Sequence, residues 1–134
     1  MAAAPAPAGV PGTDIVSVAR IAALLDRGGP DFTRRWFTDA EIAYCTSRAR
    51  PGQHFAARAA GKEAVIKALR LAWDGPVAWS SVEIVRDDRG APRVRLHGRV
   101  AEAAALAGIG EVALSLSHCD DYAVAMALAY PAGG

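Results

Sequence analysis

The spacing of apolar and polar residues changes several times along this chain, and each change marks a new element. The segment from Asp14 to Val18 follows a turn signal at Pro11–Gly12, and it predicts a short strand. Apolar residues then recur at helical spacing, which predicts helices over about residues 21–28 and 31–37. The chain is therefore expected to open as a strand followed by two helices.

Two more helices are predicted in the middle of the chain. The segment "TDAEIAYCTSRA" begins at Thr38 and carries Glu41 three residues later, which is a capping-box pattern. After the break "RPGQ", a long helix is predicted over about residues 54–72, and "DGP" at residues 74–76 ends it.

The second half of the chain reads mainly as strands. Residues 82–96 alternate polar and apolar on both sides of a loop that contains Gly90, which predicts a β-hairpin. A short amphipathic helix is expected over residues 98–108, and two more strands over residues 112–118 and 122–130. A turn at Asp120 and Asp121 would join those last two strands.

This order of elements predicts an α+β fold with a mainly antiparallel sheet packed against the long central helix. A chain of 134 residues is the usual size of one domain, which we place at residues 12–130. Residues 1–11 lack the basic end and apolar centre of a secretory signal, so we expect a flexible lead-in. Residues 131–134 are expected to form a loose tail.

Composition narrows the class of protein. The formal net charge is +1 and no basic run is present, which argues against non-specific binding of nucleic acid. No apolar run approaches the roughly 20 residues that span a bilayer. The two cysteines, Cys45 and Cys119, fit no metal-binding spacing, and we expect both to be buried or half-buried thiols in a reducing compartment, the cytoplasm.

The long helix holds both lysines of the chain, Lys62 and Lys67, whereas every other basic side chain except histidine is arginine. On a helical wheel Lys62 falls inside the arc that must face the core. That arc also contains Phe55, Ala59, Ile66, Leu69 and Trp73. A buried ammonium needs a carboxylate, a group of carbonyls or a route to water.

Glu63 and Lys67 lie at one margin of that arc, four residues apart. Spacing alone is compatible with a plain i,i+4 salt bridge, worth only about 0.3–0.5 kcal/mol. Gly61 costs the helix about 1 kcal/mol relative to alanine, so it points to the close approach of another backbone or a ligand. The helix by itself leaves both interpretations open.

Three segments taken together resemble the signature regions of the holo-acyl-carrier-protein synthases, the short class of 4′-phosphopantetheinyl transferases. They are "GTDIVSVARI" (12–21), "RAAGKEAVIKAL" (58–69) and "LSLSHCDDYAVAMAL" (114–128). The segment "DDRGAPRVRLHG" also resembles the hairpin of that family. The likeness runs from about Gly12 to Ala129.

The resemblance implies the 4′-phosphopantetheinyl transferase-like fold and a specific reaction. Such enzymes transfer the phosphopantetheine arm of coenzyme A to a serine of an apo acyl carrier protein and release 3′,5′-ADP. They use Mg²⁺ and usually form homotrimers with active sites between subunits. By resemblance, Asp14 and Glu63 would be the metal and catalytic carboxylates, Lys67 would meet a phosphate, and His118 and Arg58 would bind coenzyme A.

The chemistry of these residues agrees with the resemblance. Mg²⁺ prefers oxygen ligands and often takes one or two carboxylates together with substrate phosphates and water. Two carboxylates leave coordination places open for a diphosphate, and Lys67 would add a mobile positive charge. Glu63, Asp14 or a metal-bound water could each remove the proton of the carrier serine, and we favour Glu63 acting through water.

Structural interpretations stand beside these roles. Asp14 could simply cap a turn, and His118 could be a surface histidine at the end of a strand. A nucleophilic pair of His118 and Cys119 is excluded because adjacent residues on a strand point to opposite faces. Arg58 lies almost opposite Lys67 on the wheel, so only a site shared between subunits would bring both to one phosphate.

Two residues depart from the family pattern. Ala59 stands where the family commonly has an aromatic residue, and Gly61 stands where it commonly has alanine. These changes concern the packing of the helix and the coenzyme pocket more than the metal pair.

A basic rim for an acidic carrier protein is expected near the first two helices. Arg20 matches an arginine of the family, while Arg27, Arg34 and Arg35 are placed there by charge alone. The alternative is that these arginines only provide solubility. Two other functions remain open for the chain: a catalytically silent binding module of the same fold, and a metal-dependent phosphohydrolase that acts on coenzyme A. Which carrier would be served, from fatty-acid or polyketide biosynthesis or elsewhere, is left open by the sequence.

Overall fold

The computed structural model describes residues 9–73 and 75–133 and has an α+β fold, as predicted. Strand β1 (Val10–Ser17) leads into helix α1 (Val18–Trp36), which is interrupted at Gly29, where φ is 50° and ψ is −138°, and continues from Pro30. The two helices predicted over this region are therefore the two halves of α1. Residues 1–8 of the expected lead-in lie outside the described part, and Val10 and Pro11 already belong to β1.

Helix α2 (Asp39–Thr46) has the predicted capping box. Thr38 accepts a hydrogen bond from the backbone N–H of Glu41, and the Glu41 carboxylate accepts one from the backbone N–H of Thr38. Helix α3 (Pro51–Leu69) begins and ends three residues earlier than predicted. Its end is set by Arg70, whose left-handed backbone (φ 48°) breaks the helix before the predicted stop, so Trp73 lies beyond the helix and outside its core face.

The remaining elements follow the predicted order. A 3₁₀ turn (Trp79–Ser81) precedes the hairpin of β2 (Val82–Arg86) and β3 (Pro92–Leu96). Helix α4 (Gly98–Leu106) then leads into β4 (Ile109–His118) and β5 (Tyr122–Pro131).

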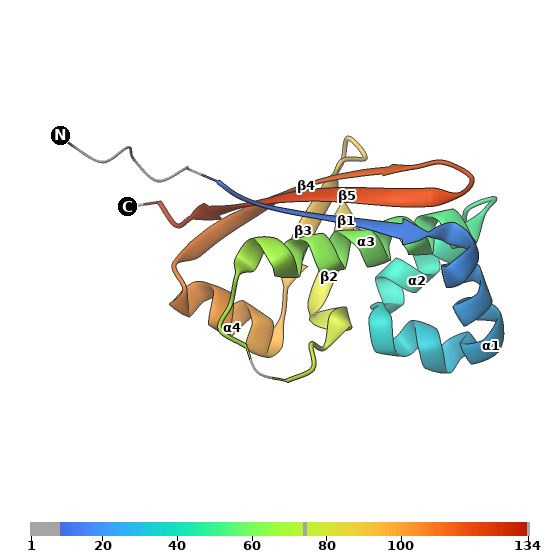
Figure 1. Ribbon diagram of the computed structural model, residues 1–134, viewed down its shortest axis with the longest axis horizontal. Coiled ribbons are helices and arrows are strands. Elements are labelled where there is room, and N and C mark those ends of the chain that lie inside the picture. The colour runs from blue at the N-terminus through green and yellow to red at the C-terminus, as the bar shows by residue number, and fades with distance from the viewer. Residues whose placement is uncertain (1–8, 74, 134) are drawn as a thin grey trace.

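All strand pairings are antiparallel, but the strands form two sheets rather than one. The larger sheet has the order β1-β5-β4, and β2 pairs with β3 alone. Figure 1 shows α3 lying along one face of the larger sheet, with α1 and α2 near one of its ends and α4 towards the other. Among residues 9–73 and 75–133, no helix combines the length and apolar character that crossing a membrane requires.

Helix α3 is central because small residues let every neighbour approach it. The alanines at alternate positions of β5 are buried against it, while its own buried residues lie on nearly all sides. Gly12 of β1 lies so close to α3 that a Cβ atom there would come within 2.1 Å of the backbone oxygen of Ala64. At Gly61 the close neighbours are the ends of the Ile84 and Leu116 side chains, and no backbone atom is among the three nearest atoms.

A carboxylate and two backbone carbonyls stabilise the ammonium of Lys62 inside the core, as the sequence predicted for a buried lysine. Its fully buried ammonium donates to Glu41 Oε1 at 2.7 Å, to the backbone oxygen of Val82 at 2.6 Å and to that of Trp79 at 3.2 Å. Glu41 Oε2 in turn accepts from the N–H of Ile84 at 3.2 Å. This buried pair fixes α3 against α2 and β2.

A second polar link lies beside it, around Glu83. Burial raises the pKa of Glu83, but hydrogen bonds with Thr38 (2.7 Å) and His97 (3.0 Å) outweigh burial and hold that pKa below its usual value. His97 therefore helps to connect β2 with the start of α4.

Candidate functional site

The sequence-predicted carboxylate Asp14 lies in the middle of β1, opposite Ala125 of β5. Side chains alternate along a strand, so Asp14 and Gly12 share the face that packs on α3, whereas Ile15 points the other way and is 63% exposed. Thr13 also bonds to the backbone oxygen of Ala125, at 3.0 Å, which anchors the strand at this point. Asp14 is therefore a residue of a strand and not the cap of a turn.

Lys67 of α3 lies against this part of β1. Its ammonium donates to Asp14 Oδ1 at 3.1 Å and to the backbone oxygen of Thr13 at 3.0 Å. Lys67 thus forms its ion pair with Asp14 of β1. This pair takes the place of the simple i,i+4 salt bridge with Glu63 within the helix. The Lys67 side chain is still 54% exposed, which leaves its ammonium accessible to a ligand.

Glu63 completes this group, one turn before Lys67 on the same margin of α3. Burial raises the pKa of Glu63 above its usual value, and the Asp14 carboxylate raises it further, while Lys67 and Arg20 oppose the increase. Two carboxylates that repel each other in this way form a place where a divalent cation would be stabilised.

A pocket of about 330 Å³ contains both carboxylates. Arg20 lies on its rim, and its inner wall is apolar, formed by Ile21, Leu24, Trp36 and Ala59 among others. We call it the carboxylate pocket. Within the described residues there is no group of three or more His, Cys, Asp or Glu side chains able to hold a metal. Two carboxylates suit Mg²⁺ when a substrate supplies further oxygen ligands.

The predicted basic residues of α1 do not all share one face. Arg20 and Arg27 are both exposed and lie seven residues apart, so they project from the same side of the helix. Arg34 lines a different hollow, next to Pro30 and Phe55. Only Arg20 lies directly at the carboxylate pocket.

Arg58 and His118 lie together in a second pocket, of about 270 Å³, on the other side of α3. Its walls also include residues that the sequence did not single out: Tyr44, His54, Ile84, Arg86, Gly90, Pro92 and Leu116. We call it the anion pocket, because none of the residues that line it is acidic. Burial, followed by the charges of His118 and of three arginines, lowers the pKa of His54.

Arg58 and Lys67 are nine residues apart, which places them on opposite sides of α3 and about 13 Å apart along its axis. Arg58 lines the anion pocket, whereas Lys67 contacts Asp14 on the opposite side of α3, as the helical wheel indicated. One chain alone does not bring all the predicted site residues together.

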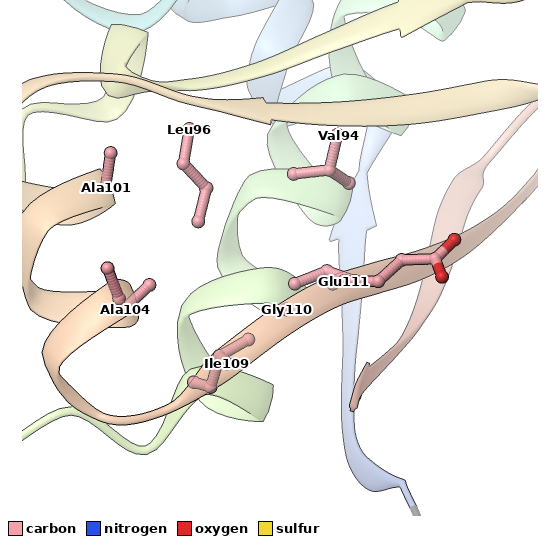
Figure 2. Close-up of a pocket in the computed structure, with 9 residues that line it drawn as sticks. Val94, Leu96, Ala101, Ala104, Ile109, Gly110 and Glu111 are labelled. Atoms are coloured by element: carbon pink, nitrogen blue, oxygen red, sulfur yellow. The ribbon is translucent and has the colours of Figure 1, made fainter. Parts of the chain in front are cut away.

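Figure 2 shows a third pocket, of about 240 Å³, between β3, α4 and the start of β4. Val94, Leu96, Ala104 and Ile109 give it apolar walls, and the one charged side chain that lines it is Glu111. It offers no positive group for a phosphate, so we do not assign coenzyme binding to it.

Several exposed apolar residues gather on the outer face of the larger sheet, beside Ser115 and Ser117 of β4. Ile15 is 63% exposed, and on β5 Met126 is 55%, Tyr122 52% and Val124 40% exposed. These four residues define what we call the outer sheet face. A contiguous apolar surface of this kind is typical of a protein interface.

The cysteines differ from one another. Cys45 is fully buried, and burial, as the largest of several causes, raises the pKa of its thiol to about 11. Cys119 is exposed in the turn between β4 and β5, so its predicted burial was wrong. That turn, which contains Asp120 and Asp121, was predicted correctly.

The chain is similar to known proteins over most of its length. A sequence model of the 4′-phosphopantetheinyl transferase superfamily matches residues 11–127. The chain is 47% identical to the holo-[acyl-carrier-protein] synthase of Moorella thermoacetica over 117 residues, which are 87% of this chain and 90% of that protein. It is 44% identical to the protein of the same name from Koribacter versatilis, over 85% of this chain and 91% of that one.

Solved structures give the same result for the fold. The holo-[acyl-carrier-protein] synthase of Neisseria meningitidis superposes with a TM-score of 0.80 at 32% identity, over 90% of this chain and 96% of that one. The ACPS–CoA complex from Chronobacterium ammoniagenes superposes with a TM-score of 0.79 at 33% identity, over 95% of this chain and 100% of that one.

Proposed function

Because the chain belongs to the 4′-phosphopantetheinyl transferase superfamily, we propose that it is a holo-acyl-carrier-protein synthase, which transfers 4′-phosphopantetheine from coenzyme A to a serine of an apo acyl carrier protein. The observation that carries this proposal is the convergence of Asp14, Glu63 and Lys67 from two distant segments. A diphosphate is the kind of group that such a cluster would bind.

In the proposed reaction the carrier serine oxygen attacks the phosphorus next to the pantetheine arm. The bond from that phosphorus to the bridging oxygen of the diphosphate breaks, and 3′,5′-ADP leaves. Glu63 would take the serine proton through a water molecule. Lys67, whose side chain is partly exposed, would hold a phosphate oxygen.

Asp14 and Glu63 would hold Mg²⁺. When bound, the ion supplies positive charge that neutralises the diphosphate and the leaving group. The mutual repulsion of the two carboxylates supports this assignment, because it disappears when a divalent cation lies between them.

The anion pocket would hold the other phosphate of coenzyme A. The reacting diphosphate has to lie at the two carboxylates, so the group that remains is the 3′-phosphomonoester. This group is a dianion at neutral pH, and Arg58 and His118 would meet it.

Since one chain separates its two pockets across α3, the complete site would lie between neighbouring copies. The outer sheet face supports an assembly, because its four exposed apolar residues would be covered in one. The resemblance gives a homotrimer. Sedimentation velocity should show three chains, and Met126→Glu should reduce the assembly, while a wild-type monomer would contradict the shared site.

Arg20 and Arg27 would meet the acidic carrier. Arg20 lies at the rim of the carboxylate pocket, where a carrier would have to present its serine. Arg20→Ala should raise KM for the carrier more strongly at low salt than at high salt. We also propose a cytoplasmic location, in keeping with the two free thiols.

A mass measurement tests the proposal. An apo acyl carrier protein from fatty-acid or polyketide synthesis is incubated with the protein, coenzyme A and Mg²⁺. Transfer adds one phosphopantetheine to the carrier, and Glu63→Gln should abolish the gain. If no carrier of a panel gains mass, the chain is a binding module, and release of 3′,5′-ADP without any carrier would identify a phosphohydrolase.

A further inference from the structure

The anion pocket contains two arginines, Arg58 and Arg86, and neither forms a salt bridge within the part of the chain that the structure describes. Arg58 is 95% buried, since only 5% of it is exposed, and within residues 9–73 and 75–133 its Nε atom finds no hydrogen-bond partner. A buried guanidinium of this kind is unfavourable unless something else stabilises it. The question is what holds it in place before a ligand arrives.

Tyr44 of α2 contacts this charge directly. The guanidinium carbon of Arg58 lies 4.1 Å from the centroid of the Tyr44 ring, and that of Arg86 lies 5.1 Å from it. Such cation–π contacts are strongest for a cation removed from water. The hydroxyl of Tyr44 also accepts a hydrogen bond of 2.7 Å from Arg86 Nη1.

Arg86 extends this arrangement to the hairpin. Its Nε donates to the backbone oxygen of Gly90 at 3.1 Å, and Gly90 and Pro92 form part of the pocket wall. Gly90 has a φ of 81°, and a Cβ atom there would lie 2.6 Å from Arg86 Nη2. Tyr44 therefore connects α2, α3 and the β2–β3 hairpin through two arginines.

We infer that Tyr44 is a positioning residue: its ring and hydroxyl hold Arg58 and Arg86 together at the anion pocket, so that both guanidiniums face one phosphomonoester. The inference rests on the proposed function, which supplies the 3′-phosphate of coenzyme A as that group. Without Tyr44 the two cations repel each other, and the more exposed Arg86 turns into solvent. The pocket would then lose its preorganisation and with it much of its affinity for phosphate.

Two substitutions separate the two contacts of Tyr44. Tyr44→Phe keeps the ring and removes the hydrogen bond to Arg86, while Tyr44→Leu removes both. Equilibrium binding of 3′,5′-ADP and of 5′-ADP is measured by calorimetry with the full chain. We expect Tyr44→Phe to weaken 3′,5′-ADP binding about fivefold and Tyr44→Leu about 30-fold, with 5′-ADP changed by less than about twofold.

Steady-state kinetics give a second readout that a merely structural role would not move. Tyr44→Leu should raise KM for coenzyme A while leaving kcat and KM for the carrier unchanged. Arg93→Gln serves as a control, because this exposed arginine pairs with Asp87 and does not line the pocket, so its removal should leave both nucleotide affinities unchanged.

Each result decides a separate point. Equal losses for 3′,5′-ADP and 5′-ADP, or unchanged selectivity in both Tyr44 variants, would overturn the inference alone. A wild-type protein that binds the two nucleotides equally would overturn the assignment of the anion pocket to the 3′-phosphate, and the role of Tyr44 with it. Should Tyr44→Leu fail to fold, Tyr44→Phe still decides the outcome.

Discussion

The geometry of the carboxylate pocket should be most sensitive to a substitution at Gly12. It precedes Asp14 by two residues on the same face of β1. A Cβ atom there would lie 2.1 Å from the backbone oxygen of Ala64 and 2.6 Å from the backbone nitrogen of Ala68. Backbone atoms of a helix cannot rotate away, so Gly12→Ala has to move the strand.

The contacts set the size of that movement. The distance from the added Cβ atom to the backbone oxygen of Ala64 has to increase from 2.1 Å to at least 3.0 Å, which displaces β1 from α3 by about 0.9 Å. Overpacking of this kind costs up to about 3 kcal/mol of folding stability. Asp14 moves with the strand while Glu63 and Lys67 stay on α3, and a misplacement of about 1 Å in an active site can lower the rate about 100-fold.

Gly61→Ala is the matched control, because it adds the same methyl group to the packing around α3 but next to side-chain ends and not to backbone atoms. The nearest atom there is Ile84 Cδ1 at 2.6 Å, the end of a side chain that can rotate. Alanine also favours the helix by about 1 kcal/mol, so stability should change by less than about 1 kcal/mol.

The assay is the rate of phosphopantetheine transfer to an apo acyl carrier protein, measured by mass spectrometry, together with thermal unfolding. We expect Gly12→Ala to lose most of its kcat even at temperatures where it is fully folded. If Gly12→Ala kept the wild-type kcat, or if Gly61→Ala lost as much, the contact of β1 with α3 would not control the site.

Three further results are expected. Lys62→Met should cost about 3–5 kcal/mol in urea unfolding, because it leaves Glu41 charged and buried without its partner; a loss below about 1 kcal/mol would contradict the buried pair. The lowered pKa of Glu83 stabilises the fold above the ordinary value of 4.5, and this stability is lost as pH falls through the lower pKa of the folded protein. The melting temperatures of the wild type and of Glu83→Gln should therefore converge on acidification. A constant difference between them from pH 7 to pH 3 would refute this. The pKa of His54 is lowered in the free protein, so an NMR titration should show it rising when 3′,5′-ADP binds, and an unchanged value would place the phosphate elsewhere.

The sequence predicted the order and type of the elements because periodicity and capping are local properties. The predicted bounds of α3 were wrong at both of its ends. Pro51 was interpreted as part of a break, although proline is favoured in the first turn of a helix, where α3 has it. The early end of α3 was missed because Arg70 adopts a left-handed backbone, which no sequence signal at an arginine predicts.

Helix α3 also shows what a helical wheel misses. The wheel assigned one narrow core face, whereas the structure buries nearly every side of the helix apart from the margin of Glu63, Ile66 and Lys67. Alanine and glycine carry little hydrophobic signal, but their size allows strands and helices to pack closely on all sides. The partner of Lys62 was equally hidden, because Glu41 lies on another helix.

The two pockets differed in how far they could be predicted. Asp14, Glu63 and Lys67 came from the resemblance together with their chemistry, and their roles stay predictions, although Lys67 and Asp14 do lie in contact. Tyr44, His54 and Arg86 were not singled out, because they come from three elements whose approach depends on tertiary packing. A tyrosine followed at a distance by arginines is an unremarkable pattern in any sequence.

The central claim is that Asp14 of β1 and Glu63 of α3 hold one divalent ion between them. Titration with Mn²⁺ followed by electron paramagnetic resonance, in the presence of 3′,5′-ADP, counts the bound ions directly. The account predicts one tightly bound ion per chain in the wild type and loss of that ion in both Asp14→Asn and Glu63→Gln. Binding of the same number of ions with the same affinity in either variant would contradict it.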